Sequence, residues 1–229
     1  GLTLEIIKPE EEARFAVISC APLVSTKTEQ LLVVDIGGGS TELVWLDLSQ
    51  VAPRDRPRSI MRLHAGFHPP ESPFPAAKVV DWISVPLGVA TLRDQFSDVS
   101  DDAARYALMS WFFEEQLANF APYADEQARE GFQIVGTSGT VTTVAASHLG
   151  LRRYDRTKVD GLRMSSDQIE AVIGPDGPPA RSAHWPGPAG FDHVWIRDFA
   201  GFVADLADRS AERRGSGLAR RVALRADVR

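Results

Sequence analysis

The chain has 229 residues, of which 44% are hydrophobic and 24% are charged, a balance typical of a globular protein. Its 25 basic and 31 acidic residues give a net charge of −6, which argues against a protein that coats nucleic acid. The single cysteine, Cys20, excludes a disulfide framework and favours a cytoplasmic location. No apolar run reaches the roughly 18 residues of a membrane span, so we expect no membrane partner.

The first predicted elements are a strand, a helix and two further strands. Residues 2–7 alternate weakly between apolar and polar side chains, which predicts a short strand. A helix should begin at Pro9, because proline suits the first helical turn and the glutamates after it favour the positive end of the helix dipole. The apolar run at residues 31–36 predicts a buried strand, and the β-forming residues 41–48 predict another. The glycines between them are therefore expected to form a tight hairpin.

The rest of the chain alternates between strands and helices, which predicts an α/β fold. Residues 50–75 are rich in proline and arginine without clear periodicity, and we expect a surface loop there. A capping box of Ser165 and Gln168 should open the last helix. The other predicted elements are a strand at 83–87, a helix at 101–120, a strand at 132–135, a loop at 136–140 and a helix at 141–149.

Two glycine-rich loops, each directly after a predicted buried strand, are the main functional indication. Consecutive backbone N–H groups in such loops can converge on phosphate oxygens. Asp35 ends the strand before the first loop, where its carboxylate could hold a divalent cation or orient water. The second loop opens a helix, whose dipole favours an anion. The first loop comprises Gly37, Gly38, Gly39 and Ser40, and the second comprises Gly136, Thr137, Ser138, Gly139 and Thr140.

Three familiar motifs do not match these loops. A Walker loop needs a Gly-Lys pair, and the chain has none. A Rossmann loop needs a helix after its glycines, whereas residues 37–39 lead into a strand, and a nucleophile elbow needs a residue between Ser138 and the next glycine. Taken singly, the first loop is also compatible with a plain turn between strands, and the second with a flexible helix N-cap. The basic residues at 152–163 are compatible with a solvated face or with phosphate docking.

The order of these motifs resembles the exopolyphosphatase/guanosine pentaphosphate phosphatase (Ppx/GppA) family. The resemblance runs from about Leu4 to about Ile173. The strings D-I-G-G-G-S-T-E-L and V-G-T-S-G-T-V-T-T are highly specific when they occur in this order. The strings that carry the resemblance are E-E-A-R at 11–14, V-D-I-G-G-G-S-T-E-L-V at 34–44, V-P-L-G at 85–88, G-T-S-G-T-V-T-T at 136–143, Y-D-R at 154–156 and V-D-G at 159–161.

The resemblance implies the actin-like ATPase superfamily fold, in which two ribonuclease-H-like lobes flank a phosphate-binding cleft. No D-x-G-S/T-N-S string, with which the family's first lobe begins, occurs here, so we expect the chain to lack most of that lobe. Residues 1–24 should be the end of the first lobe with a hinge helix, and residues 25–173 the second ribonuclease-H-like lobe. Residues 174–229 are rich in proline and glycine and then in arginine; we interpret them as an atypical C-terminal segment, with a shifted reading frame as one hypothesis.

The resemblance also implies Mg²⁺-dependent hydrolysis of the terminal phosphoanhydride of inorganic polyphosphate, guanosine pentaphosphate, or both. By position, Glu12 resembles the family's catalytic base, which activates water. Asp35 and Glu42 resemble its acidic catalytic and metal-binding residues, and the two glycine-rich loops resemble its phosphate-binding loops. The expected partners are polyphosphate or guanosine penta- or tetraphosphate, and a second copy of the chain in a homodimer.

Two other functions stay open on the sequence. An ATPase or kinase of the same superfamily would hold phosphate with the same loops. A nonenzymatic or truncated lobe that binds phosphate or a guanosine alarmone is the other alternative, because most of the first lobe is expected to be absent.

Overall fold

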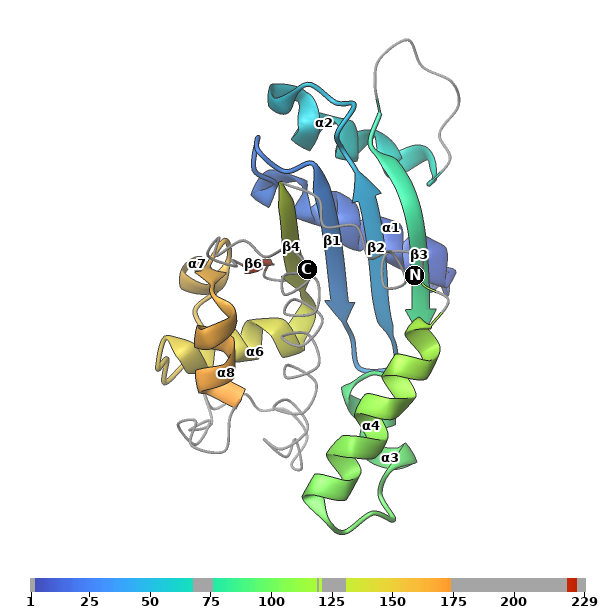
Figure 1. The fold of residues 1–229 in the computed structure, drawn as a ribbon, viewed down its shortest axis with the longest axis vertical. Coiled ribbons are helices and arrows are strands. Elements are labelled where there is room, and N and C mark those ends of the chain that lie inside the picture. Colours follow the sequence, from blue (N-terminus) through green and yellow to red (C-terminus); the bar gives the residue numbers. More distant parts are fainter. Residues whose placement is uncertain (1–2, 68–75, 119, 121–130, 174–221, 226–229) are drawn as a thin grey trace.

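A mixed sheet of six strands, in the order β3-β2-β1-β4-β6-β5, organises the computed structural model (Figure 1). The structure describes residues 3–67, 76–118, 120, 131–173 and 222–225. β1, β2 and β3 form an antiparallel meander, β4 runs parallel to β1 and to β6, and β5 is antiparallel to β6. The strands are β1 (Gln30–Ile36), β2 (Thr41–Asp47), β3 (Lys78–Val85), β4 (Phe132–Thr137), β5 (Arg163–Met164) and β6 (Val222–Arg225).

Helices cover both faces of this sheet. α1 crosses one face behind β1 and β2, and the remaining long helices lie on the other side or at its lower end (Figure 1). The α-helices are α1 (Pro9–Cys20), α2 (Arg56–Met61), α3 (Val89–Gln95), α4 (Asp102–Leu117), α6 (Ser138–His148), α7 (Arg156–Val159) and α8 (Ser166–Ile173). Short 3₁₀ turns lie at Ala21–Leu23, Pro53–Asp55 and Arg62–Ala65. Among the described residues, no helix combines the length and the apolar character that a membrane crossing requires.

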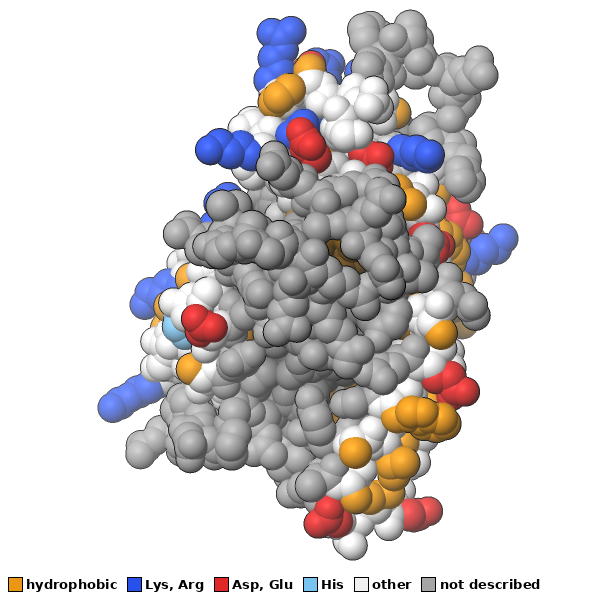
Figure 2. All heavy atoms as spheres, viewed as in Figure 1, with side chains coloured by type: hydrophobic (Ala, Val, Ile, Leu, Met, Phe, Trp, Pro, Cys, Tyr) orange, Lys and Arg blue, Asp and Glu red, His pale blue; other side chains and the backbone are white. Residues whose placement is uncertain are grey.

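The alternation of side chains along the central strand β1 divides the core in two. Leu31 and Val33 pack under α1, whereas Leu32 and Val34 pack on the opposite face with α4, α6 and α8. Both sets are at most 3% exposed, so β1 is buried on both faces, as its apolar run predicts. The outer side of α4 is less well covered: Trp111 is 60% exposed, and Figure 2 shows apolar side chains gathered over this helix.

The helix from Pro9, the hairpin of β1 and β2, and the long helix α4 confirm the predictions made for them. The capping box also forms, since the Ser165 N–H donates to Gln168 Oε1 at 2.9 Å and the Gln168 N–H donates to Ser165 Oγ at 3.2 Å. These features depend on local patterns, which explains why the sequence reveals them.

The strand predicted at residues 2–7 and the loop predicted at residues 136–140 are both wrong. Residues 3–7 form no strand, and Leu4 and Ile6 are 95% and 101% exposed, because no described strand lies beside them to accept their backbone hydrogen bonds. The loop expected at 136–140 does not exist either, because β4 continues to Thr137 and α6 begins at the next residue. The segment 174–221, with its reading-frame hypothesis, lies outside the described residues, while residues 222–225 add strand β6.

Residues 53–65 form helical turns rather than the expected surface loop. Ile60 and Leu63 are fully buried in the same core as α1, and Arg56 is 4% exposed. The Arg56 guanidinium donates to the carbonyl oxygens of Thr26 and Val51 at 2.7 and 3.3 Å, which satisfies it inside the protein. The prolines in this segment indicated a loop, and no clear helical periodicity opposed that interpretation. Proline is nevertheless compatible with the first turn of a helix.

We expect Leu63→Ala to lower the free energy of unfolding by roughly 2–5 kcal/mol, because it leaves a cavity in the core under α1. Met61→Ala is the matched control: Met61 is 48% exposed, so its truncation should change stability by less than about 0.5 kcal/mol. Urea unfolding monitored by circular dichroism measures both values. Equal effects of the two substitutions would contradict the packing of this segment.

Candidate functional site

A row of polar residues crosses the sheet at the ends of β1 and β4. Asp35 lies opposite Glu42 on β2 and opposite Thr137 on β4, and Glu42 lies opposite Ser84 on β3. Residues directly opposite one another point to the same face, with Cβ atoms about 4.5–5.5 Å apart in antiparallel pairs. Val33 and Val44, the next residues on this face, pack under α1. The polar row therefore shares the face of α1.

Glu42 is the most deeply buried acidic residue in this row, with 1% of its surface exposed. The Ser84 hydroxyl donates to Glu42 Oε1 at 2.8 Å, whereas the buried Oε2 has no hydrogen-bond partner among the described residues. Burial raises the pKa of the Glu42 carboxyl above its usual value, the hydroxyls of Ser40 and Ser84 oppose the rise, and the nearby Glu12 carboxylate adds to it. The Ser40 hydroxyl lowers the Glu42 pKa although it forms no hydrogen bond of ordinary geometry with the buried Oε2. Glu42 thus presents one unsatisfied oxygen.

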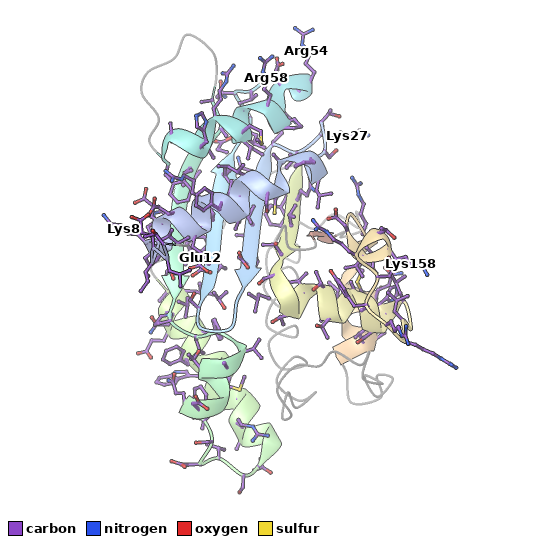
Figure 3. All side chains as sticks on the ribbon, turned by 180° about the vertical axis from the view of Figure 1, so that it is seen from behind. Lys8, Glu12, Lys27, Arg54, Arg58 and Lys158 are labelled. Carbon is purple, nitrogen blue, oxygen red and sulfur yellow. The ribbon has the colours of Figure 1, made fainter. Side chains whose placement is uncertain are left out.

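Glu12 comes to this row from the first turn of α1. Figure 3 shows it where the helix passes over the sheet, and its negative charge is close enough to contribute to the rise of the Glu42 pKa. Its neighbour Glu11 is occupied, since its carboxylate accepts from the Lys8 N–H at 3.2 Å and pairs with Arg14 at 3.6 Å. Glu12 is exposed, its backbone N–H donates to the Lys8 carbonyl at 3.1 Å, and its carboxylate makes no hydrogen bond or ion pair with the described residues.

The first glycine-rich loop is the turn between β1 and β2, closed by a hydrogen bond from the Gly37 N–H to the Ser40 carbonyl at 3.0 Å. The N–H groups of Gly38, Gly39 and Ser40 donate to no described residue. A Cβ atom added at Gly38 or Gly39 would meet nothing within 4 Å. Three consecutive donors therefore lie on an open side of the loop, an arrangement that suits an anion.

The second glycine-rich segment is the junction of β4 and α6. Ser138 has a φ of 78°, a left-handed conformation that L-residues seldom adopt, and this turn ends the strand and begins the helix within one residue. The Thr137 side chain does not cap α6, so the first N–H groups of this 11-residue helix stay available as hydrogen-bond donors to a ligand. Their direction and the helix dipole both favour an anion.

The two segments lie side by side. Asp35, which lies two residues before the first loop, is directly opposite Thr137 of the second segment in the parallel pair β1 and β4, and the Thr140 hydroxyl contacts the Ile36 carbonyl at 3.4 Å. All the predicted loop residues, 37–40 and 136–140, thus gather at one edge of the sheet beside Asp35 and Glu42. Loop donors next to carboxylates can hold a phosphate chain and a cation that neutralises it.

The acidic residues fit a metal ion that takes most of its ligands from water and substrate rather than from the protein. Within the described parts of the chain, no three His, Cys, Asp or Glu residues are grouped closely enough to form a metal site by themselves. Mg²⁺ usually takes only one or two protein carboxylates and completes its shell with water and phosphate. Asp35 and Glu42 are adjacent, and the unpartnered Glu42 Oε2 is an oxygen that such a cation would satisfy.

The basic residues at 152–163 lie elsewhere. They follow the C-terminal end of α6, which is about 16 Å long, whereas the glycine-rich segment is at its beginning. The five cations of this stretch are exposed, and Figure 3 shows Lys158 directed away from the part of the molecule that carries Glu12. Their position favours a solvated face over contact with a phosphate at the two loops.

Sequence reasoning missed three residues that support the site. Ser84 was hidden because its pairing with Glu42 depends on the register of β3, which no local pattern reveals. Gly88 belongs to the V-P-L-G string, which was a usable signal, and Thr91 follows it in the first turn of α3. Both contact the first glycine-rich loop.

Solved structures resemble this chain in fold. An exopolyphosphatase-like protein is 23% identical, with a TM-score of 0.69 over 99% of this chain and 65% of its own. The Aquifex aeolicus PPX-GPPA enzyme is 22% identical, with a TM-score of 0.64 over 98% of this chain and 62% of its own. An exopolyphosphatase from Cytophaga hutchinsonii is 17% identical, with a TM-score of 0.55 over 95% of this chain and 59% of its own. The chain thus spans 59% to 65% of these proteins.

The likeness confirms the expected α/β fold, with a mixed sheet flanked by helices, and the coverage of these proteins is consistent with a partial lobe. A sequence model of the Ppx/GppA phosphatase family matches residues 1–166, which include the three acidic residues and both glycine-rich segments. The matched region therefore holds the whole candidate site. The chain belongs to the Ppx/GppA phosphatase family.

Proposed function

We propose that this site binds a chain of phosphates and hydrolyses the terminal phosphoanhydride of inorganic polyphosphate, guanosine pentaphosphate, or both. The observation that carries the proposal is the adjacency of two sets of available backbone N–H donors with the paired Asp35 and Glu42. Phosphoryl transfer to water needs a fixed phosphate, neutralised charge and an aligned water, and little covalent help from the protein.

Each group has a distinct task in this proposal. The N–H groups of residues 38–40 and of the first turn of α6 hold the oxygens of the terminal phosphates. Asp35 and Glu42 would hold Mg²⁺, which would supply positive charge to the phosphate that is transferred. Glu12 accepts the proton of the attacking water, because it is exposed, its carboxylate has no hydrogen-bond partner among the described residues, and its charge acts on Glu42.

The donors favour a polyanion, because they are backbone groups that recognise oxygen and charge rather than a base or a sugar. The names of two similar solved proteins, both called exopolyphosphatases or exopolyphosphatase-like, support the same substrate class. The nonenzymatic alternative stays open because the similar proteins are longer than this chain. Binding of polyphosphate or guanosine pentaphosphate without release of phosphate under Mg²⁺ would favour that alternative.

Glu12→Gln should lower kcat by roughly 10²–10⁴-fold with little change in KM, because glutamine cannot accept the proton of water. The measurement is phosphate release from long-chain polyphosphate and from guanosine pentaphosphate in the presence of Mg²⁺. Glu10→Gln is the matched control, since Glu10 lies in the same first turn of α1 and is exposed. An unchanged kcat in Glu12→Gln would remove Glu12 from this role.

Glu42→Gln should raise the free energy of unfolding at pH 7 by about 1 kcal/mol when chelator removes divalent cations, because it deletes a buried charge with an unpartnered oxygen. Burial holds the native pKa of Glu42 above its ordinary value, so the native state retains its proton after the unfolded state has lost it. Stability attributable to this group therefore falls as pH rises from 4.5 through the native pKa. The advantage of Glu42→Gln should shrink below pH 4.5 in urea titrations. A variant less stable than wild type at pH 7 would contradict this.

Mg²⁺ together with tripolyphosphate should raise the melting temperature of the wild type, because a ligand that binds only the native state stabilises it. At a ligand concentration of about 100 Kd the gain is roughly 2.7 kcal/mol. Asp35→Asn should lose most of the part that depends on Mg²⁺, while Asp167→Asn, on the distant α8, should keep it. Scanning calorimetry with and without chelator measures the difference, and equal gains in both variants would exclude Asp35 as a ligand.

A further inference from the structure

The first turn of α3 contacts the glycine-rich loop at residues 37–40 by donating hydrogen bonds to the backbone carbonyl groups of the loop. The Val89 N–H donates to the Gly37 carbonyl at 3.1 Å, and the Ala90 N–H donates to the Gly38 carbonyl at 2.8 Å. The Thr91 hydroxyl donates to the Gly39 carbonyl at 3.2 Å. Three successive carbonyl groups of the loop are thus held by three successive residues of one helix.

These contacts determine where the N–H groups of the loop point. In a planar trans peptide the C=O and N–H bonds point in opposite directions. The carbonyls of Gly37, Gly38 and Gly39 share their peptide groups with the N–H groups of residues 38, 39 and 40. Because all three carbonyls point to α3, these three N–H groups point away from it, and they donate to no described residue.

The same contacts strengthen the donors. A hydrogen bond to the carbonyl of a peptide group polarises that group and makes its N–H a better donor. The three N–H groups on the opposite side of the loop, which face a phosphate in the proposed function, are therefore strengthened as donors.

The fit between loop and helix requires glycine at position 88. A Cβ atom on Gly88 would lie 2.5 Å from the Gly38 carbon and 2.6 Å from the Gly37 oxygen, and both of these are backbone atoms that cannot rotate away. The Leu87 carbonyl accepts from the buried Thr41 hydroxyl at 2.8 Å, which ties this turn to the start of β2. Loop, turn and strand are therefore held together as one unit.

Thr91 is the one residue of this contact that acts through its side chain. Its Oγ1 accepts from the Gly88 N–H at 2.7 Å, and its single proton is shared between the carbonyls of Gly39 and Gly88 at 3.2 and 3.1 Å. The Gly39 carbonyl belongs to the peptide group that ends in the Ser40 N–H. The orientation of this last donor thus depends on one hydroxyl group.

We propose that Thr91 is a positioning residue that orients the Gly39–Ser40 peptide group of the loop for binding of a phosphate oxygen. The inference rests on the proposed function, because it concerns the same loop and the same class of ligand. Thr91 touches no substrate in this proposal and acts through the backbone of Gly39.

The test compares the wild type with Thr91→Val, which keeps the branched shape but lacks the hydroxyl, and with Thr91→Ser, which restores it. Isothermal titration calorimetry with tripolyphosphate and MgCl₂ gives the affinity, and ¹⁵N NMR follows the amides of Gly38, Gly39 and Ser40. We expect roughly three- to tenfold weaker binding by Thr91→Val, as for loss of one hydrogen bond, a reduced response of the Ser40 amide, and recovery in Thr91→Ser. Should Thr91→Val not fold, Thr91→Ala takes its place.

Ser97→Ala is the matched control, because it removes a hydroxyl that contacts the Asp94 carbonyl at 3.0 Å just beyond the other end of α3. Equal losses in Ser97→Ala and Thr91→Val would assign the effect to the stability of α3 and overturn the role of Thr91. The inference alone would be overturned if the wild type binds tripolyphosphate and Thr91→Val binds it with the same affinity and the same response of the Ser40 amide. Absence of binding, or silent loop amides, in the wild type would overturn the proposed function and the inference together.

Discussion

The pairing of β1 with β2 on one side and with β4 on the other is the constraint on which the site depends. It places Asp35 opposite both Glu42 and Thr137, so the two acidic groups, the glycine-rich loop at 37–40 and the junction of β4 and α6 lie at the same end of these strands. The register is fixed because β1 buries alternate residues in two separate cores. A slip by one residue would exchange the faces and put the carboxylates among apolar side chains.

Local chemistry made much of this architecture predictable from the sequence. The glycines between two apolar strands indicated the hairpin, and Pro9 with its glutamates indicated α1. The contacts of Ser84 with Glu42 and of Thr91 with Gly39 were not predictable, because they join residues 42 and 52 positions apart. The helical turns at 53–65 were missed for a similar reason: their apolar residues are explained by the core under α1 rather than by their own periodicity.

The cation binding proposed for Glu42 and the stability of the fold make opposite demands on this side chain. A carboxylate that is 1% exposed and has one unpartnered oxygen lowers the stability of the empty protein, because burial disfavours its charged form. The Ser84 hydroxyl and the neighbouring Ser40 offset only part of this cost. A bound cation would offset the rest, so ligand affinity and folding stability are linked through a single side chain.

The junction between β4 and α6 has a consequence for how this protein family can vary. No spacer separates the last residue of the strand from the first of the helix, and Ser138 makes the turn alone. The end of β4 therefore determines how α6 is rotated about its own axis and in which direction its first N–H groups point. One residue inserted or deleted here would rotate the beginning of α6 by about 100° and turn its amide groups away from their present direction. Length changes should consequently be tolerated at the far end of this helix and not at its origin.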